Sequence, residues 1–502
     1  MKILIGFDIL LSYLLNINYT DGINLLFTWI NRIGAKKNTD IGSLSILTHF
    51  VSKADLSRIH GFDIIKEIGI MRPEIKFLNN IISGYGQKSK EDFRALLMQL
   101  NILLDNNIDY FITENLKIHE FAKILNLESK VYTIEEFIER CTIDYRHLDE
   151  SKGIEIQEVK FGTLSLKDSF FKTFINEYKP YYYEWFNKKK GDNVYVCKDK
   201  SGQIRALLKL KIEECNENYD NINPKFAPAR RLKICSFKVD YTGQKLVQRF
   251  IRIIFDYSII QKVDEIYVTI YNNSSQRCRL INIIESWGFY LHGTKNGKEQ
   301  VYVRKLNKEL KGIPTYDYPF QSLASPTYII PIEETYSHAL LPSFDVCRYP
   351  LDVEPYKSAI KKVITLPFRY EISYKNANLL FYQISMDKEN CGIIASGIFE
   401  NCNNNFQTKN SFVFNCKKRS IFPESILSDL WYRSEEHTVI NFLYNYSFGK
   451  NIIRNQILDN AEIDIQHLLE GEPVMINSNQ FKQIITDTVY EQNFIINKAQ
   501  VC

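Results

Sequence analysis

The sequence predicts a multidomain α/β protein, and three observations support this fold class. The chain has 502 residues, and a single hydrophobic core rarely grows beyond about 250–300 residues. Short apolar runs alternate with helical patterns through residues 1–150, which predicts a parallel sheet. Short strands dominate after residue 335, and the prolines between these regions predict a linker, or an extended crossing segment, over residues 309–334.

Composition narrows the classes of protein. The hydrophobic fraction is 45% and the charged fraction 24%, which is ordinary for a globular chain rather than a disordered one. The ten cysteines include no Cys-x-x-Cys pair, so the close ligand pairs of a zinc site are absent. The apolar start contains Lys2 and Asp8 and no cleavage site, and no 18-residue stretch lacks polar groups. We therefore expect a cytoplasmic protein without a membrane partner.

The charge is unevenly distributed. The net charge is +4 overall, with −3 over residues 1–150 and +7 over residues 151–502 by count along the sequence. Any surface for a polyanion is therefore expected after residue 150.

Acidic residues follow two predicted strands of the first region. Asp8 ends an apolar strand, and Glu114 follows the strand at residues 108–113. The carboxyl ends of parallel strands meet at one edge of a sheet. Carboxylates gathered there suit Mg²⁺ or Mn²⁺, and a pair of such ions can activate water against a phosphodiester.

The strings Ile3-Leu4-Ile5-Gly6-Phe7-Asp8 and Asp109-Tyr110-Phe111-Ile112-Thr113-Glu114-Asn115 resemble the PIN-domain nucleases over residues 1–140. The resemblance implies a PIN-like parallel α/β/α sheet in a domain of residues 1–150. It also implies Asp8, Asp55, Asp92 and Glu114 as catalytic carboxylates. Asp8, Asp55 and Glu114 would be the metal ligands among them.

The segment from Arg231 to Ile260 reads as a strand, a loop with Gly243 and a helix. Helix N-termini bind phosphates through unpaired N–H groups. A second strand, a helix ending in Trp287-Gly288-Phe289 and a final strand follow. This order resembles the GNAT acetyltransferases over residues 160–306. The resemblance implies a GNAT-like α+β domain over residues 155–308 that binds acetyl-CoA. The thioester would lie beside Phe237, Lys238 and Val239, and the cofactor pyrophosphate near Gly243, Gln244, Lys245, Leu246, Val247 and Gln248.

The last region, residues 335–502, combines basic and aromatic residues with short strands and a helical tail. Charge attracts phosphate and rings stack on bases, so this mixture suits RNA. The region resembles the PUA-like group that includes ASCH and EVE domains, which implies a small β-barrel. The residues expected to bind nucleic acid are Lys357, Lys361, Lys362, Lys417, Arg419 and Trp431.

Three functions stay open at this point. The favoured one is an acetyl-CoA-dependent N-acetyltransferase acting on, or guided to, RNA or a ribonucleoprotein. The second is a metal-dependent PIN-type ribonuclease or toxin-like protein. The third is a nucleic-acid-binding scaffold with decayed catalytic domains, which is favoured by the residues that depart from the family patterns: Arg94, Asn115, Val247 and Ile284.

Overall fold

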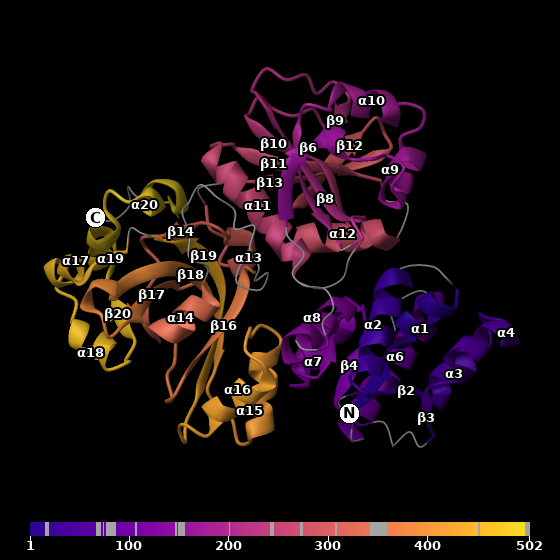
Figure 1. Cartoon of the computed structure of the whole chain (residues 1–502), viewed down its shortest axis with the longest axis horizontal. Coiled ribbons are helices and arrows are strands. Elements are labelled where there is room, and N and C mark those ends of the chain that lie inside the picture. Colours follow the sequence, from indigo (N-terminus) through magenta and orange to yellow (C-terminus); the bar gives the residue numbers. More distant parts are fainter. Residues whose placement is uncertain are drawn as a thin grey trace.

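The computed structural model describes residues 1–15, 20–66, 72–73, 75–76, 87–105, 108–145, 148, 156–199, 201–240, 245–271, 275–306, 309–341, 359–449 and 452–496. Three lobes follow one another along the chain, and each is built on a sheet of its own (Figure 1). The predicted multidomain α/β class is confirmed.

The N-terminal lobe is a parallel sheet with helices packed against it. Its five strands have the order β3-β2-β1-β4-β5, and every adjacent pair is parallel. The central strand carries Ile3, Leu4 and Ile5, all fully buried, because a parallel sheet is covered on both faces. The strands are β1 (Lys2–Ile5), β2 (Lys36–Asp40), β3 (Asp63–Ile65), β4 (Tyr110–Ile112) and β5 (Val131–Tyr132). The helices are α1 (Phe7–Leu14), α2 (Thr20–Arg32), α3 (Ile41–Leu47), α4 (Lys53–Leu56), α6 (Gln87–Asp105), α7 (Leu116–Ile124) and α8 (Ile134–Asp144).

Helix α8 starts where the sequence predicts it. The Thr133 side chain accepts from the N–H of Glu136, and the Glu136 carboxylate accepts from the N–H of Thr133. This reciprocal pair satisfies two of the N–H groups that a helix start leaves without partners. The helix is buried over most of its length, which sets it against other parts of the protein rather than solvent.

The middle lobe is a mixed sheet of eight strands in the order β6-β7-β8-β10-β11-β13-β12-β9. β10 and β11 are parallel, and every other neighbouring pair of these described strands is antiparallel. The hairpin predicted from the Gly202 turn is confirmed by β7 and β8. The strands are β6 (Ile156–Lys160), β7 (Asn193–Lys198), β8 (Ile204–Glu213), β9 (Ile222–Asn223), β10 (Arg231–Val239), β11 (Glu265–Ile270), β12 (Tyr290–Lys295) and β13 (Glu299–Lys305). The helices are α9 (Lys172–Glu177), α10 (Tyr182–Lys188), α11 (Leu246–Ile260) and α12 (Ser275–Ser286).

The two faces of this sheet carry different cores, because strand side chains alternate between faces. One face packs Leu232 and Ile266 against Phe250 and Ile254 of α11. The other face packs Val194 and its neighbours against the segment with α9 and α10. The strand–helix–strand–helix–strand order predicted for residues 231–304 is confirmed.

The C-terminal lobe is an open sheet rather than the expected barrel. Its six strands have the order β16-β19-β18-β17-β15-β20, and β16 and β20 form its two edges among the described strands. The strands are β14 (Gln321–Ser322), β15 (Thr327–Glu333), β16 (Lys361–Leu366), β17 (Asn378–Ile384), β18 (Gly392–Asn403), β19 (Thr438–Ser447), β20 (Val474–Ile476) and β21 (Ile495–Ile496). The helices are α13 (Pro314–Asp317), α14 (Glu334–Leu340), α15 (Lys409–Lys417), α16 (Glu424–Trp431), α17 (Asn455–Asn460), α18 (Ile465–Leu469), α19 (Ser478–Ile485) and α20 (Val489–Phe494).

The proline-rich segment is not a linker. Residues 327–333 form β15, which is parallel to β17 over its whole length. On the other side, β20 pairs with β15 only as far as Ile329. Pro331 therefore lies beyond the β20 pairing, where a strand tolerates a residue without an N–H group.

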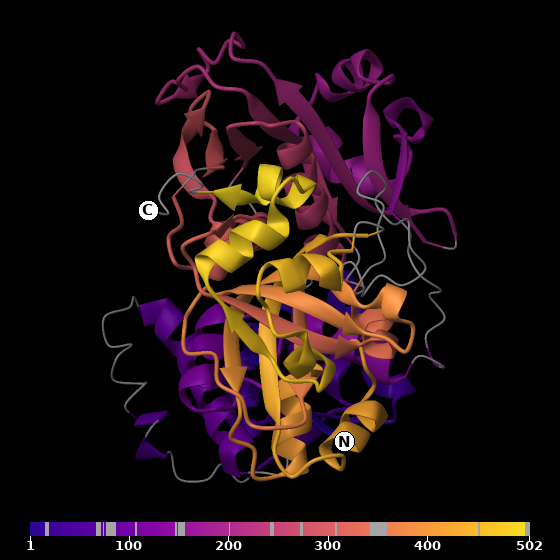
Figure 2. The same cartoon turned by 90° about the vertical axis from the view of Figure 1, so that its left-hand side faces the viewer.

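The middle and C-terminal lobes share a core. Tyr318 and three residues of the C-terminal lobe, Ile360, Ile398 and Leu443, belong to the same buried cluster as the face of the middle sheet under α11. The Tyr318 ring lies edge-on to Phe255 and Trp287, with centroids 5.4 Å from each. Figure 2 shows the C-terminal lobe in front, with the middle lobe above it and the N-terminal lobe behind and below.

Gly288, in the Trp287-Gly288-Phe289 turn, lies where a side chain cannot fit. Its φ is +80°, and a Cβ there would collide with the guanidinium of Arg304. Arg304 is itself buried and donates to the carbonyl of Tyr318 at 2.9 Å.

We expect Gly288→Ala to lower the free energy of unfolding by about 1–3 kcal/mol more than Gly297→Ala. Gly297 has a φ of +64° with nothing near its Cβ position, so it controls for backbone strain. Urea unfolding followed by tryptophan fluorescence measures the difference, and equal losses would refute the collision.

Candidate functional site

The two parallel strands of the middle sheet, β10 and β11, stop pairing before β10 ends, and the place where they separate is named the slot. β10 and β11 pair from Arg231↔Glu265 to Ile234↔Val268 and no further. β10 has an irregularity between Ile234 and Ser236 on its β8 side, so Cys235 is an extra residue in that strand. A bulge bends its strand, and beyond this bulge β10 continues to Val239 paired with β8 alone. The two strands therefore separate at Cys235.

The slot exposes backbone donors and acceptors. In a strand, consecutive residues direct their N–H and C=O groups to opposite neighbours. The N–H of Asp240 donates to Arg205 at the end of β8, so the backbone groups of Val239 and Phe237 face away from β8 and toward the slot. A ligand with an extended polar chain can bind such an edge as an added strand. The slot therefore lies beside the residues predicted to flank the thioester.

The side chains beside the slot are fixed on both faces. The Phe237 ring packs edge-on against Phe250 of α11, with centroids 5.9 Å apart. On the other face, Lys238 Nζ donates to the Phe170 carbonyl at 2.8 Å and forms an ion pair with Asp240 at 2.7 Å. These contacts set the positions of the side chains of Phe237 and Lys238.

A buried carboxylate that the sequence did not point to lies one strand from the slot. Glu299 begins β13, and its Oε2 atom is buried without a hydrogen-bond partner among the described residues. The β11–β13 register places Glu299 beside Tyr271. Burial, the charge of Glu299 and a hydrogen bond to Glu299 raise the pKa of Tyr271. Burial and then the charge of Glu299 raise the pKa of Tyr178, whose ring lies 5.5 Å from that of Tyr271.

The start of α11 is covered by another lobe. Lys245 precedes the helix in a left-handed conformation, with φ of 51°. Its N–H donates to Glu139 Oε1 of α8 at 2.7 Å. Lys245 is 3% exposed and Glu139 is 6% exposed. Burial raises the pKa of Glu139 and lowers the pKa of Lys245.

The other residues predicted to hold the cofactor pyrophosphate differ in their burial and in their contacts. Leu246 is fully buried, and Val247 is half-buried. Gln248 accepts from the N–H of Lys361 at 3.2 Å, which directs it to the C-terminal lobe. Gly243 and Gln244 lie outside the described residues. The helix start that follows the slot in the chain is therefore contacted by Glu139.

The carboxylates predicted for a nuclease centre do not gather around a metal position. Asp8 accepts from the Thr113 hydroxyl at 3.0 Å and from the N–H of Glu114 at 2.8 Å. Glu114 accepts from the N–H of Ile134. Asp55, which lies on α4, accepts from the hydroxyl of Ser52. The side chain of Asp92 lies outside the described residues. Within the described part of the chain, no group of three His, Cys, Asp or Glu side chains is placed to hold a metal ion.

Asp40 is a further acid at this sheet edge that the sequence analysis missed. It ends β2, is buried, and accepts from the N–H of Ser43 at 2.7 Å as the N-cap of α3. Gln99 Nε2 donates to Asp40 Oδ2 at 3.0 Å, and Gln99 Oε1 accepts from the N–H of Phe7. The β2 sequence Lys-Lys-Asn-Thr-Asp lacks the apolar run that indicates a buried strand. The one available signal was an Asp three residues before a Ser, which is typical of a helix N-cap.

Asp8 makes the stability of the N-terminal lobe depend on pH. Burial raises its pKa from 3.8 to about 6. Between these values the folded protein keeps a proton that the unfolded chain has lost, so the free energy of unfolding falls as pH rises from about 4 to 6. We expect Asp8→Asn to remove this slope and to be more stable than the wild type by about 3 kcal/mol at pH 7. An amide can accept from Glu114 and donate to Thr113. The free energies of unfolding of the wild type and Asp8→Asn, measured from pH 4 to 7, check this. The same dependence on pH in both proteins would contradict it.

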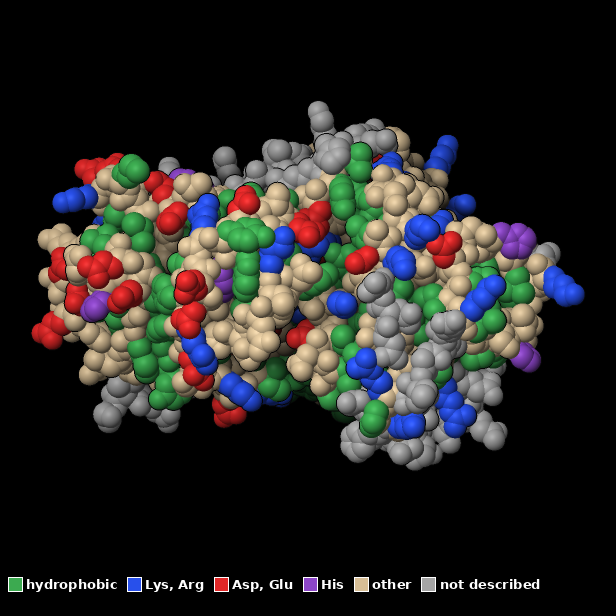
Figure 3. Space-filling model, turned by 90° about the horizontal axis from the view of Figure 1, so that it is seen from below, with side chains coloured by type: hydrophobic (Ala, Val, Ile, Leu, Met, Phe, Trp, Pro, Cys, Tyr) green, Lys and Arg blue, Asp and Glu red, His purple; other side chains and the backbone are tan. Residues whose placement is uncertain are grey.

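The basic residues predicted to bind nucleic acid lie largely inside the molecule. Lys362 is 1% exposed and donates to the Leu340 carbonyl, and Lys417 is 4% exposed. Arg419 pairs with Glu400. Burial lowers the pKa of Lys361. Trp431 packs beside Phe412 and His437. Lys357 lies outside the described residues. These residues do not form the exposed basic patch that the prediction requires. Acidic and basic side chains are mixed over much of the face in Figure 3.

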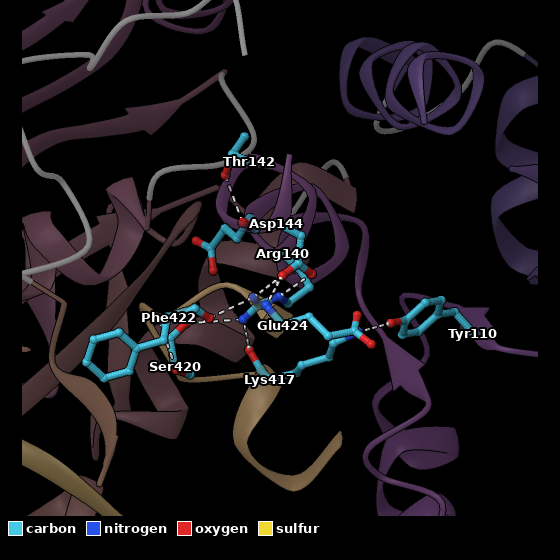
Figure 4. Close-up of polar contacts among 9 residues, drawn as sticks. Tyr110, Arg140, Thr142, Asp144, Lys417, Ser420, Phe422 and Glu424 are labelled. Atoms are coloured by element: carbon cyan, nitrogen blue, oxygen red, sulfur yellow. Dashed lines mark hydrogen bonds and ion pairs between the residues drawn. The ribbon is translucent and has the colours of Figure 1, made fainter. Parts of the chain in front are cut away.

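Lys417 is buried where α8 and β4 of the N-terminal lobe pack against the C-terminal lobe. Arg140 of α8 donates to the carbonyls of Lys417, Ser420 and Phe422 at 2.9, 3.3 and 2.8 Å (Figure 4). It also forms an ion pair with Asp144, whose carboxylate accepts from the N–H of Glu424. Lys417 Nζ donates to the hydroxyl of Tyr110 at 2.7 Å and pairs with Glu424 at 2.5 Å. This set is named the α8 junction.

Comparison with known proteins locates similarity in one region. No protein-family model and no curated protein sequence matches the chain. Solved structures of acetyltransferases do match. One is a GNAT-family acetyltransferase from Listeria monocytogenes, 15% identical, covering 32% of this chain and 99% of that chain, with a TM-score of 0.20. Another is the NatC complex bound to Gag peptide and CoA, 17% identical, covering 31% and 100%, with a TM-score of 0.21.

A third match is the IAA acetyltransferase from Bacillus cereus, 12% identical, covering 31% of this chain and 100% of that chain, with a TM-score of 0.21. No described helix is long and apolar enough to span a membrane.

Proposed function

We propose that the middle lobe is an N-acetyltransferase that takes the acetyl group from acetyl-CoA. The observation that carries this proposal is the separation of β10 from β11 at the Cys235 bulge. It supplies a slot whose edge is formed by the backbone groups of Phe237 and Val239. When bound, acetyl-CoA would supply a thioester carbonyl carbon, to which an amine nitrogen would bond while the carbon–sulfur bond breaks and CoA leaves as the thiolate.

The residues of the lobe have distinct parts in this reaction. The N–H groups of Phe237 and Val239 hold the acyl arm as a neighbouring strand would, which fixes the carbonyl relative to the acceptor. Glu299 takes the proton that the amine loses, since its Oε2 atom is buried and without a partner among the described residues. Tyr178 and Tyr271 remain protonated because burial and Glu299 raise their pKa values.

Two other functions have less support. A metal-dependent ribonuclease requires Asp8, Asp55 and Glu114 to converge, and each instead accepts a hydrogen bond from its own neighbours. Guidance by RNA remains a prediction from the sequence. Two of the lysines on which it rested, Lys362 and Lys417, are buried.

The backbone of Val239 tests the slot. We expect Val239→Pro to abolish acetyl-CoA binding, because proline lacks the N–H group that faces the slot. The substitution breaks no hydrogen bond between β10 and β8, since this N–H faces away from β8. Val239→Ala keeps the N–H and serves as the matched control. Ligand at about 100 times its dissociation constant should raise the free energy of unfolding by about 2.7 kcal/mol. The thermal shift with acetyl-CoA is the measurement, and an undiminished shift in Val239→Pro would exclude the slot as the binding site.

Glu299 tests the chemistry separately from binding. We expect Glu299→Gln to reduce kcat/KM for acetyl transfer to a primary amine by roughly 100-fold, since general-base catalysis is worth about 10²–10⁴. The dissociation constant for acetyl-CoA should not change. Glu309→Gln, at an exposed carboxylate, is the control and should transfer at the wild-type rate. Equal loss in both variants, or none in Glu299→Gln, would remove Glu299 from the mechanism.

A further inference from the structure

A carboxylate and an ammonium face each other across the β12–β13 hairpin without forming an ion pair. Glu299 and Lys295 are register partners at the closed end of this hairpin, so their side chains leave the same face of the sheet from neighbouring points. Glu299 is 6% exposed, and its Oε2 atom has no hydrogen-bond partner among the described residues. Lys295 is half-buried, and within the same part of the chain its ammonium forms no ion pair.

The pair lies on the face of the middle sheet opposite α11. Val301, two residues after Glu299, has its side chain on the same face, and it packs there with Tyr267. The ammonium of Lys233 lies over the Tyr267 ring, 5.4 Å from its centroid. Glu299 and Lys295 therefore share this face with the lysines of β8 and β10.

The other lysines of this face already have carboxylate partners. Three ion pairs are formed, by Lys209 with Asp192 at 2.5 Å, by Lys211 with Glu213 at 3.0 Å and by Lys233 with Glu213 at 3.5 Å. Burial lowers the pKa of Lys295, although the charge of Glu299 opposes this shift. A buried carboxylate without a cation costs free energy, which a bound ligand of opposite charge recovers. In the described part of this face, Lys295 lacks an anion and Glu299 lacks a cation.

We propose that Lys295 and Glu299 bind the acetyl acceptor, and that this acceptor is an α-amino acid with its carboxylate at Lys295 and its amine at Glu299. The inference rests on the proposed acetyltransferase function for the fate of the amine. One carbon joins the two charged groups of an α-amino acid, so a single small ligand can contact both side chains of a cross-strand pair. The neighbouring lysines disfavour an acceptor that carries positive charge alone, because like charges repel.

The protons balance in the reaction that this arrangement supports. The ammonium of the amino acid gives one proton to the Glu299 carboxylate, which leaves a neutral amine. The nitrogen then forms the amide bond to the acetyl carbon as the carbon–sulfur bond breaks. The second amine proton converts the departing thiolate to the thiol, and Glu299 returns its proton to solvent. Lys295 takes no proton in these steps and acts by holding the carboxylate of the acceptor.

Acceptors that differ only in the α-carboxylate test the inference on the wild-type protein. Each protein amino acid is assayed beside the amine that its decarboxylation gives, such as tyrosine beside tyramine, by the thiol released from acetyl-CoA. We expect an accepted amino acid to have a kcat/KM about tenfold or more above that of its amine, since a hydrogen-bonded charge pair contributes this much.

Lys295→Met removes the ammonium and keeps most of the side-chain length. We expect it to raise KM for the amino acid about tenfold and to leave kcat and the KM for the matching amine unchanged. A purely structural role of Lys295 would change both acceptors alike. Lys298→Met, at an exposed lysine in the turn of the same hairpin, is the control and should behave as the wild type does.

The outcomes separate this inference from the proposed function. Equal kcat/KM within every pair of acceptors, or an unchanged KM for the amino acid in Lys295→Met, would overturn the amino-acid site and leave the acetyltransferase proposal standing. Transfer to none of the acceptors, with the acetyl-CoA thermal shift intact, would overturn the amino acid as acceptor and keep the slot. Calorimetric binding of an amino acid that Lys295→Met weakens, without an acetyl-CoA shift or transfer, would support the site and overturn the acetyltransferase.

Discussion

The buried guanidinium of Arg140 fixes the position of α8, and the other two lobes depend on that position. A guanidinium has five donors in a planar fork, and here it meets three carbonyls and one carboxylate. Removing a buried charge from such a network costs more than an exposed ion pair contributes. Because α8 is held in this way, Lys417 is buried, the start of α11 is covered, and the lobes contact one another through polar as well as apolar groups.

The sequence predicted the elements of the fold well where local patterns determine them. Three consecutive buried isoleucine and leucine residues in β1 require a sheet covered on both faces. Thr133 and Glu136 mark the start of α8. The proline-rich segment was predicted wrongly as a linker, because the tolerance of β15 for Pro331 depends on where β20 stops pairing. That boundary is a tertiary fact, and no local pattern contains it.

The role of Phe237, Lys238 and Val239 beside a thioester stays a prediction from the acetyltransferase resemblance. The structure shows that β10 and β11 no longer pair at these residues. The bulge at Cys235, which separates the strands, has no clear sequence signature. The basic residues were misjudged because their partners are remote. Lys417 contacts Tyr110, 307 residues away, and a sequence cannot distinguish such a lysine from an exposed one.

The core shared by the middle and C-terminal lobes ties their folding together. Tyr318, Ile360, Ile398 and Leu443 complete the apolar layer over α11. A chain ending near residue 308 would leave the outer face of α11 against water, with the hydrophobic cost that follows from exposing buried area. Cutting the chain between these two lobes would therefore expose a core that they share, although they are built on separate sheets and follow one another in the sequence.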